Sequence, residues 1–440
     1  MTFKNIAFLS FIPDTGHIMP LLRIAYTLKE YKYNVICYFP EECRNLSNNF
    51  KIPFKSLGRV SEIVDDDVFI RTSKRTIFYN AFSYYNDIYI SYIQPIDNLF
   101  KNKLKDIIEL LKYNKPDVII ADENHIYNKS YKFIANQLNI TIIIHNSEGN
   151  LRYMSNLFIF NYGMNNYPLI VQHFFEMIVK FQNFIRYHKR NKPAIKKDFL
   201  FNKKNNNKII YISTGLALIE KIINDKYKKI INNEKYQEKY IHFPVVKDKR
   251  DIKLPEKLKF WLDNSNDKPV IYISLGTKIQ PDKKFIQKII KGLKSLNVKI
   301  LLVIPKKQRN HLKEYNNEQN ILIEEFIPQS LVLLHKNIRC FITHGGAGGI
   351  QESLLAGKPM LCIPFMFDQP YNSSIICKLK AGIRLNKNKV TPRSIKKSMK
   401  KLLYDPCYRN SAQSIMLKLK EIDGGKSLIN YLTKTLDITN

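Results

Sequence analysis

Short apolar runs alternate with longer amphipathic stretches along most of this chain, and that alternation restricts the possible folds more than any other feature. The apolar runs span residues 6–11, 34–39, 118–121, 141–144, 270–274, 298–304, 340–343 and 359–365. Runs of this kind are typical of strands buried on both faces of a parallel sheet. The amphipathic stretches between them then supply the crossover helices. We therefore predict an α/β fold with one parallel sheet in each half of the chain.

The chain has 440 residues, which is enough for two or three domains. Residues 244–268 separate the two sets of apolar runs and are rich in Lys, Asp, Asn and Pro. This composition favours an exposed connector over a core element. We therefore divide the chain into a first domain over residues 1–243, a linker over residues 244–268 and a second domain over residues 269–440.

Two segments interrupt the α/β pattern because they are dense in aromatic residues. Residues 76–92 carry many Tyr and Phe, and residues 157–187 carry many Phe. Each segment either packs helices into the core of the first domain or lines a pocket for an apolar ligand. Basic residues follow the second segment, at 186–197, so this region is also compatible with contact to an anionic membrane surface.

The chain carries 71 Lys and Arg against 38 Asp and Glu, which gives a formal net charge of +33. An excess of this size invites a nucleic acid or an anionic membrane as partner. The Lys residues, however, are scattered among Asn, Ile and Tyr along the whole chain, and we find no nucleic-acid-binding motif. We therefore expect solvated background charge, no nucleic-acid partner and at most a peripheral contact with a membrane.

The cysteines and the start of the chain indicate a cytoplasmic protein. The six cysteines form no C-x-x-C pair, and several lie in apolar runs, so we expect buried thiols in a reducing compartment. The apolar run after Met1 is too short for a signal peptide. No stretch of the sequence reaches the roughly 18 apolar residues that a membrane-spanning helix needs.

A glycine-rich segment, His-Gly-Gly-Ala-Gly-Gly-Ile-Gln-Glu, spans residues 344–352 directly after the apolar run at 340–343 and opens an expected helix. Glycines let a backbone approach a ligand closely, and the free N–H groups at a helix start bind phosphate oxygens. The segment is neither a P-loop nor a G-x-G-x-x-G motif. Taken alone, it is either a phosphate site or only a tight strand-to-helix connection.

The residues on both sides of this segment favour the phosphate site. The sequence FIPQ at residues 326–329 precedes it, PFMFDQ at residues 364–369 follows it, and the box from Phe326 to Gln369 is 44 residues long. Together these residues resemble the donor-sugar signature of family-1, UDP-dependent glycosyltransferases. The sequences KPVIYISLGT at residues 268–277 and GHIMPLL at residues 16–22 are similar to two further motifs of that family.

The resemblance implies the GT-B architecture, in which two Rossmann-like domains face each other across a cleft. The first domain would bind the acceptor and the second the nucleotide-sugar donor. The resemblance also implies that His17 is the general base, which takes a proton from an acceptor hydroxyl. Asp122 would orient His17, a pairing that follows the logic of catalytic triads. Asp117 and Glu123 are nearby alternatives to Asp122.

The resemblance assigns the donor-binding residues by the part of the donor that they contact. Those expected at the diphosphate are His344, Gly346, Gly348 and Gly349, joined by Ser274 or Thr277. Those expected at the uracil base are Phe326, Gln329 and the backbone of Ile327. Those expected at the ribose and the sugar are Glu352, Asp368 and Gln369. No metal and no other cofactor is implied, and the histidines show no metal-ligand spacing.

We therefore expect an inverting, metal-independent transferase that moves a hexose, with glucose favoured, from a UDP-sugar to a hydroxyl of a lipophilic small molecule. Phe326 and the sequence AGG at residues 347–349 replace the Trp and the W-N-S of plant-type members. In this respect the chain looks closest to bacterial macrolide, sterol and carotenoid glycosyltransferases, some of which use dTDP-sugars. Two alternatives stay open: a transferase acting on a lipid or cell-wall precursor at a membrane surface, and a catalytically decayed nucleotide-sugar binding protein.

Overall fold

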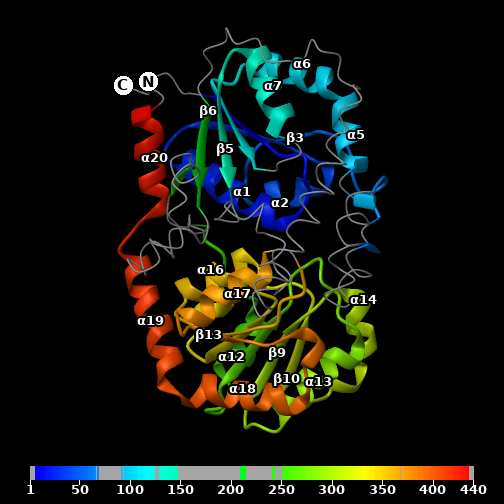
Figure 1. Ribbon diagram of the computed structural model, residues 1–440, viewed down its shortest axis with the longest axis vertical. Helices are drawn as coiled ribbons and strands as arrows, with labels where there is room; N and C mark the ends of the chain where they lie inside the picture. Colours follow the sequence, from blue (N-terminus) through cyan, green and yellow to red (C-terminus); the bar gives the residue numbers. More distant parts are fainter. Residues whose placement is uncertain are drawn as a thin grey trace, which may run out of the picture.

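The computed structural model describes residues 5–65, 67–68, 91–92, 94–123, 128–146, 209–214, 240–242, 250–366 and 368–435. These residues form two lobes, one built mainly from each half of the sequence (Figure 1). Apart from Ser91 and Tyr92, both aromatic segments lie outside the described residues, as do the basic residues after the second. The interpretations of these segments therefore stay predictions.

The first half of the chain forms a parallel sheet of seven strands in the order β3-β2-β1-β4-β5-β6-β7. The strands are β1 (Asn5–Leu9), β2 (Asn34–Phe39), β3 (Phe54–Ser56), β4 (Val118–Asp122), β5 (Thr141–Asn146), β6 (Ile209–Ser213) and β7 (Tyr240–His242). The described helices of this half are α1 (Thr15–Glu30), η1 (Glu41–Cys43), α2 (Arg44–Asn49), α5 (Gln94–Asn102), α6 (Leu104–Asn114) and α7 (Asn128–Leu138).

Strand β1 shows why these residues form a doubly covered sheet. Successive side chains of a strand point to opposite faces. Ala7 and Leu9 join the apolar core on one face, whereas Ile6 and Phe8 join the core on the other. All four side chains are buried. Because both faces are covered, residues 6–9 of the strand are all apolar, which confirms the expectation drawn from its sequence.

The second half forms a parallel sheet of six strands in the order β10-β9-β8-β11-β12-β13. The strands are β8 (Val270–Ser274), β9 (Lys299–Val303), β10 (Ile321–Glu324), β11 (Ile338–Thr343), β12 (Met360–Cys362) and β13 (Gly382–Arg384). The helices are α12 (Glu256–Asp263), α13 (Lys283–Lys294), α14 (Lys306–Arg309), η8 (Asn310–Tyr315), α15 (Gln329–Leu334), α16 (Ala347–Leu355), α17 (Gln369–Lys378), η9 (Lys387–Lys389), α18 (Pro392–Tyr404), α19 (Pro406–Lys420) and α20 (Gly424–Thr435). The predicted pair of parallel sheets is confirmed.

Part of the predicted linker is the amphipathic helix α12. Leu258 and Leu262 on this helix are buried in the core of the second half, whereas Phe260 is exposed. The polar composition of the segment therefore reflects the outer face of a packed helix. Residues 256–263 belong to the second half rather than to an exposed connector.

The last described helix, α20, packs on the first half although α18 and α19 cover the second. Leu428 and Leu432 lie in the same apolar core as Ile18 and Leu21 of α1. Figure 1 shows α19 and α20, in orange and red, running along one side of the molecule from the lower lobe to the upper. The chain therefore returns to its first half after completing the second sheet.

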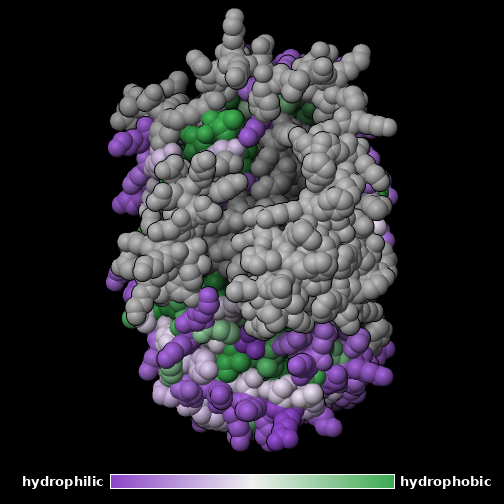
Figure 2. Space-filling view, in the orientation of Figure 1, coloured by the Kyte–Doolittle hydropathy of each residue, from purple (hydrophilic) through white to green (hydrophobic). Residues whose placement is uncertain are grey.

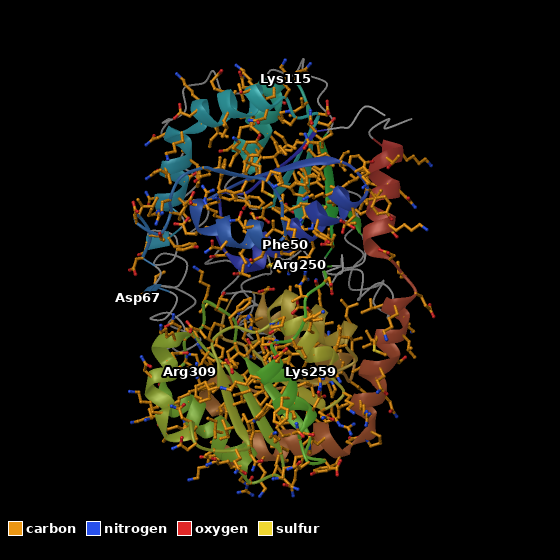
Figure 3. The ribbon with its side chains drawn as sticks, turned by 180° about the vertical axis from the view of Figure 1, so that it is seen from behind. Phe50, Asp67, Lys115, Arg250, Lys259 and Arg309 are labelled. Atoms are coloured by element: carbon orange, nitrogen blue, oxygen red, sulfur yellow. The ribbon has the colours of Figure 1, made fainter. Side chains whose placement is uncertain are left out.

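Arg250, just before α12, makes another contact between the halves. Its guanidinium carbon lies 3.5 Å from the centroid of the Phe50 ring, and its Nη1 donates to the carbonyl oxygen of Asn49 at 3.3 Å. Figure 3 shows Phe50 and Arg250 beside each other at the junction of the two lobes. A cation–π contact thus links the halves where the chain enters the second one.

The described surface of the second half is largely hydrophilic on the face shown in Figure 2. All six cysteines are free thiols, and four of them are buried: Cys37, Cys43, Cys340 and Cys362. Burial raises the pKa of Cys340 to about 12, so this thiol stays protonated. Within the described part of the chain, no helix combines the length and the apolar character needed to cross a membrane.

Candidate active site

His17 and Asp122 come together at the carboxyl ends of two neighbouring strands. Strands β1 and β4 run parallel, so α1, which follows β1, begins beside the end of β4. His17 lies in the first turn of α1, and its Nδ1 is 2.9 Å from Asp122 Oδ2. The alternative acid Asp117 lies at the other end of β4, where its carboxylate accepts a hydrogen bond from the amide of Asn5. The geometry therefore pairs His17 with Asp122.

Burial dominates the electrostatics of this pair. Asp122 is 1% exposed, and burial raises the pKa of its carboxyl above the ordinary value of 3.8, while the contact with His17 offsets part of that rise. The side chain of His17 is 20% exposed, so a ligand can reach part of its ring. A carboxylate held this close stabilises an imidazole that gains a proton. The pair therefore has the arrangement of a general base with an orienting acid.

A second histidine, His145, lies next to this pair on strand β5, in register with Asp122. Its Nε2 is 2.8 Å from the Thr214 hydroxyl oxygen. Burial, helped by the nearby charge of His17, lowers the pKa of His145 to about 3. His145 is therefore neutral at physiological pH. The sequence analysis gave His145 no role. Its position at the carboxyl end of a strand is the signal that could have found it, because ligand sites of parallel sheets lie at that edge.

A cavity of about 280 Å³ lies where the loop after β8 meets the start of α1. Its lining includes Asp14 from the first half and Thr277 and Lys278 from the second. The Lys278 Nζ lies 3.0 Å from Asp14 Oδ1, and the Tyr92 hydroxyl donates to the same oxygen at 2.7 Å. The cavity therefore lies between the two halves, beside the turn of α1 that carries His17.

The glycine-rich segment forms the turn between β11 and α16, as predicted. Gly346 occupies the N-cap position, and no side chain caps this helix. Gly348 is exposed, and a Cβ there would meet no atom within 4 Å, whereas Gly349 packs against Phe341. The first N–H groups of α16 therefore have space for an anion. Of the two further candidates, Thr277 lines the cavity between the halves and Ser274 ends β8.

Two glycines make room for the His344 ring. A Cβ on Gly276, whose φ is +83°, would lie 2.7 Å from His344 Cε1, and one on Gly346 would lie 2.5 Å from Nε2. Burial lowers the pKa of His344 to about 4, so the imidazole is neutral at physiological pH. Its Nδ1 has no hydrogen-bond partner among the residues that the structure describes. A neutral imidazole has one nitrogen that donates a hydrogen bond and one that accepts, and the buried Nδ1 is the one without a partner in the described part of the chain.

Gln329 and Glu352 form a hydrogen-bonded network that reaches into both halves. Gln329 Nε2 donates to Glu352 Oε2 at 2.6 Å, and the hydroxyl of the buried Tyr272 donates to Gln329 Oε1 at 2.7 Å. The other carboxylate oxygen, Glu352 Oε1, accepts a hydrogen bond from Arg23 of α1. The acid predicted to bind the ribose is therefore held from two sides.

The two residues before Pro328 differ sharply in exposure. Phe326 is 80% exposed, so most of its ring is available for stacking. The side chain of Ile327 is buried in the core of the second half, which leaves its backbone groups for contact with a base. The roles of Phe326 and Ile327 at a base stay predictions.

The residues predicted to bind the sugar lie at the start of α17. Asp368 directly precedes this helix and accepts a hydrogen bond from Asn372 Nδ2 at 2.5 Å. The buried Gln369 accepts hydrogen bonds at Oε1 from the backbone amides of Phe365 and Met366, at 2.9 and 3.0 Å. Gln369 thus fixes the loop before α17, a role that the sequence analysis did not foresee.

Over residues 60–422 the chain matches the sequence model of the family described as UDP-glucoronosyl and UDP-glucosyl transferase. It belongs to this family. Among family relatives, it is 35% identical over 155 residues to the protein ugt-47 of Caenorhabditis elegans, covering 34% of this chain and 29% of that protein. It is 35% identical over 165 residues to UDP-glycosyltransferase UGT4 of Dactylopius coccus, covering 36% and 31%. The matched part thus spans about a third of the length of these relatives.

Solved structures from the same fold class match nearly the whole chain. The glycotransferase of kitacinnamycin aligns with a TM-score of 0.68 at 17% identity, covering 99% of both chains. The spinosyn forosaminyltransferase SpnP aligns with a TM-score of 0.66 at 14% identity, covering 99% of this chain and 100% of that one. These similarities confirm the predicted GT-B fold of this family member.

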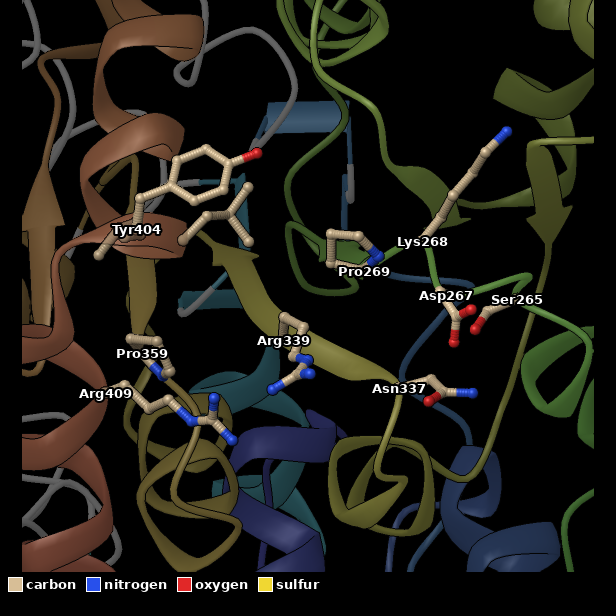
Figure 4. Close-up of a pocket in the computed structure, with 11 residues that line it drawn as sticks. Ser265, Asp267, Lys268, Pro269, Asn337, Arg339, Pro359, Tyr404 and Arg409 are labelled. Carbon is tan, nitrogen blue, oxygen red and sulfur yellow. The ribbon is translucent and has the colours of Figure 1, made fainter.

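A further cavity, of about 290 Å³, lies at the edge of the second sheet opposite to the glycine-rich turn (Figure 4). Its lining residues lie where strands begin: Lys268 and Pro269 precede β8, Arg339 is near the start of β11, and Pro359 precedes β12. Parallel strands begin at one edge of a sheet and end at the other. This cavity is therefore remote from the glycine-rich turn, which follows the end of β11, and none of the residues predicted to bind the donor lines it.

The described residues include no group of three or more His, Cys, Asp or Glu placed to hold a metal ion. Besides His145, the structure adds Arg23 and Lys278 to the site, which the sequence analysis did not single out. Arg23 is a charge inside the apolar stretch of α1, which is the signal that could have found it. Lys278 pairs with a residue far away in the sequence, and no local pattern reveals such a contact.

Proposed function

We propose that this protein transfers a hexose from a UDP-sugar to a hydroxyl of a lipophilic small molecule, with inversion at the anomeric carbon and without a metal ion. One observation carries the proposal: a single helix, α1, contacts both predicted sites. His17 pairs with Asp122, and Arg23 pairs with Glu352 of the donor-binding segment. A base held this close to a donor site fits a direct transfer between two bound substrates.

His17 would act through Nε2, because Nδ1 faces Asp122. As the acceptor oxygen forms its bond to the anomeric carbon, the imidazole takes the hydroxyl proton and Asp122 stabilises the resulting imidazolium. The bond from the anomeric carbon to the diphosphate oxygen breaks with its electron pair leaving on UDP. Attack from the face opposite the nucleotide inverts the configuration in a single step.

The start of α16 would bind the leaving diphosphate. Its free N–H groups and the positive end of the helix dipole favour an anion, and the neutral His344 can donate a further hydrogen bond. These donors stabilise the charge that develops on UDP as the glycosidic bond breaks. They support a metal-independent reaction because they can stabilise the negative charge of the leaving diphosphate in place of a bound cation.

The segment from Phe326 to Glu352 supports a uridine nucleotide as donor. The exposed Phe326 ring can stack on the base, Gln329 and the Ile327 backbone can bond its edge, and Glu352 can accept the ribose hydroxyls. One relative bears the name anthocyanidin 3-O-glucoside 5-O-glucosyltransferase, from Gentiana triflora. UDP-glucose is therefore the first donor to test.

The first test measures how far UDP, dTDP, GDP and their glucose conjugates protect the purified full chain against thermal unfolding. A ligand that binds only the folded state raises the apparent stability. We expect the uridine nucleotides to protect most strongly. Stronger protection by dTDP than by UDP would show that the donor is a thymidine nucleotide rather than a uridine nucleotide. Protection by none of the nucleotides would favour a catalytically decayed protein and overturn the proposal.

The second test measures sugar transfer to a panel of hydroxylated aromatic and polycyclic molecules and to lipids in vesicles. The His17→Ala variant should keep its protection by UDP and lose transfer. His335→Ala is the matched control, because His335 also pairs with an aspartate, Asp263, at 3.0 Å, but at the opposite edge of the second sheet. Unchanged turnover in His17→Ala would contradict the mechanism. Transfer to vesicle lipids alone would replace the small-molecule acceptor with a membrane substrate.

A further inference from the structure

Arg23 joins the two halves of the chain at the acid predicted to bind the ribose. It lies on α1, six residues after His17, and its Nη2 donates to Glu352 Oε1 on α16. Arg23 is 9% exposed, and the side chain of Glu352 is 12% exposed. Charges this far from water are costly unless they are paired. Each of the two residues therefore depends on the other for its charge to be tolerated.

The second half anchors the other side of Glu352. Its Oε2 accepts from Gln329, and Gln329 in turn accepts from Tyr272. Tyr272 is buried, and its ring stacks on Phe341 with centroids 4.8 Å apart. One carboxylate oxygen is thus tied to the core of the donor-binding half, and the other is tied to α1. The position of the carboxylate depends on both halves.

Helix α1 contacts the second half at its start as well. Asp14, at the N-cap position of α1, lies 3.0 Å from Lys278 on the loop after β8. His17 lies between Asp14 and Arg23 on the same helix. The predicted base is therefore carried by a helix that touches the donor-binding half on both sides of it.

We propose that Arg23 is a donor-positioning residue: it neutralises Glu352 and holds the carboxylate where it can accept the ribose hydroxyls of a nucleoside diphosphate. This inference rests on the proposed function. The diphosphate is an anion, and an uncompensated carboxylate beside its binding site would repel it. With Arg23 in place the pair is neutral overall, and each carboxylate oxygen still has a lone pair for a hydroxyl.

The same contact couples donor binding to the base. A ribose bound at Glu352 fixes the guanidinium of Arg23, and with it the helix that carries His17. Loss of Arg23 should therefore raise the KM for the donor and lower kcat, while the KM for the acceptor stays unchanged. A bridge that merely held the folded halves together would instead change the two KM values alike.

The test compares UDP affinity in five forms of the full chain: wild type, Arg23→Gln, Arg23→Lys, Glu352→Gln and the Arg23→Gln/Glu352→Gln double variant. We expect Arg23→Gln to weaken UDP binding about tenfold and Arg23→Lys to restore part of it, because lysine keeps the charge. The double variant should lose less affinity than the product of the two single losses, since removing Glu352 also removes the repulsion. Arg44→Gln is the matched control, because Arg44 pairs with Glu41 within the first half.

Circular dichroism verifies that each variant is folded, and Arg23→Lys keeps the test decisive if Arg23→Gln unfolds. Wild-type affinity in Arg23→Gln, or a double variant whose loss equals the product of the single losses, would overturn the role of Arg23 and leave the proposed function standing. A wild-type chain that binds no UDP would overturn the proposed function itself, so the two failures are distinguishable.

Discussion

Asp122 and His145 occupy matching positions on the neighbouring strands β4 and β5, at the edge of the sheet where α1 begins. Burial favours the neutral form of both side chains: it raises the pKa of Asp122 and lowers the pKa of His145. His145 is therefore neutral and does not compete with His17 for the carboxylate. His17, whose Nδ1 is 2.9 Å from Asp122 Oδ2, is the histidine that pairs with this acid.

The Asp122→Asn variant should lower kcat by a factor on the order of 10³ and leave UDP affinity unchanged. An amide can occupy the same space, but it neither holds the imidazole in the required tautomer nor stabilises its charged form. Steady-state transfer assays measure kcat, and thermal protection measures UDP binding. Asp263→Asn, which alters the His335 pair instead, is the control and should behave like wild type. A kcat within threefold of wild type in Asp122→Asn would refute the orienting role.

Acid should destabilise the protein through His145. Its pKa is about 3 in the folded chain against an ordinary value of 6.5, so the unfolded chain binds the extra proton between these values. The free energy of unfolding is therefore unaffected by this group above about pH 6.5 and falls as the pH drops toward 3. At about pH 5 the loss amounts to roughly 2 kcal/mol.

Urea denaturation at pH 7 and pH 5 measures this loss. His145→Gln cannot take up the proton in either state, so its own loss between the two pH values should be smaller by about the same 2 kcal/mol. Equal losses in the variant and the wild type would show that other groups cause the acid sensitivity.

The Gly276→Ala variant should weaken UDP binding about tenfold, because the new Cβ would lie 2.7 Å from the His344 ring and displace it. Gly357→Ala is a matched control, since Gly357 also has a positive φ, +65°, and the nearest atom to its Cβ would be the sulfur of the flexible Met416 side chain at 3.0 Å, with Gln413 in ordinary contact at 3.4 Å. Both variants should unfold at a lower temperature. Only Gly276→Ala should bind UDP more weakly, as isothermal titration can measure; equal affinities would remove His344 from the diphosphate site.

The Phe326→Ala variant should bind UDP about tenfold more weakly, and Phe326→Trp should bind it at least as tightly as wild type, because stacking on a base grows with ring area. Removing a ring that is 80% exposed costs little stability, so the effect on binding can be read directly. Phe260→Ala is the control, because it removes a different exposed ring, which lies on α12. Unchanged affinity in Phe326→Ala would place the base elsewhere.

The longer strands could be predicted from the sequence because burial on both faces makes most of their residues apolar. Strands β1, β4, β8 and β11 all lie on apolar runs identified in this way. Strand β3 has only three residues, two of them exposed, and such a strand cannot be distinguished from a loop by its pattern. Strand β6 has an apolar composition like that of β8, but the sequence analysis did not identify it.

The residues of the candidate site also differ in how far the sequence alone predicts them. The residues of the glycine-rich turn, such as His344 and Gly346, were predictable because a strand, a turn and a helix follow one another in the sequence. The partnership of His17 with Asp122 came only through the resemblance to the family. The contact of Arg23 with Glu352 could not be predicted, because it depends on how two separately formed halves pack together.

The return of α20 to the first half has a mechanical consequence. In the part of the chain that the structure describes, the first lobe is followed by α12 of the second, and α19 of the second is followed by α20 on the first, so two connections join the lobes. With two connections, one lobe can rotate against the other only about the line through both connections. Because α20 packs directly on α1, any such rotation is transmitted to the helix that carries His17 and Arg23. The end of the chain thus restrains the same helix that carries His17 and Arg23.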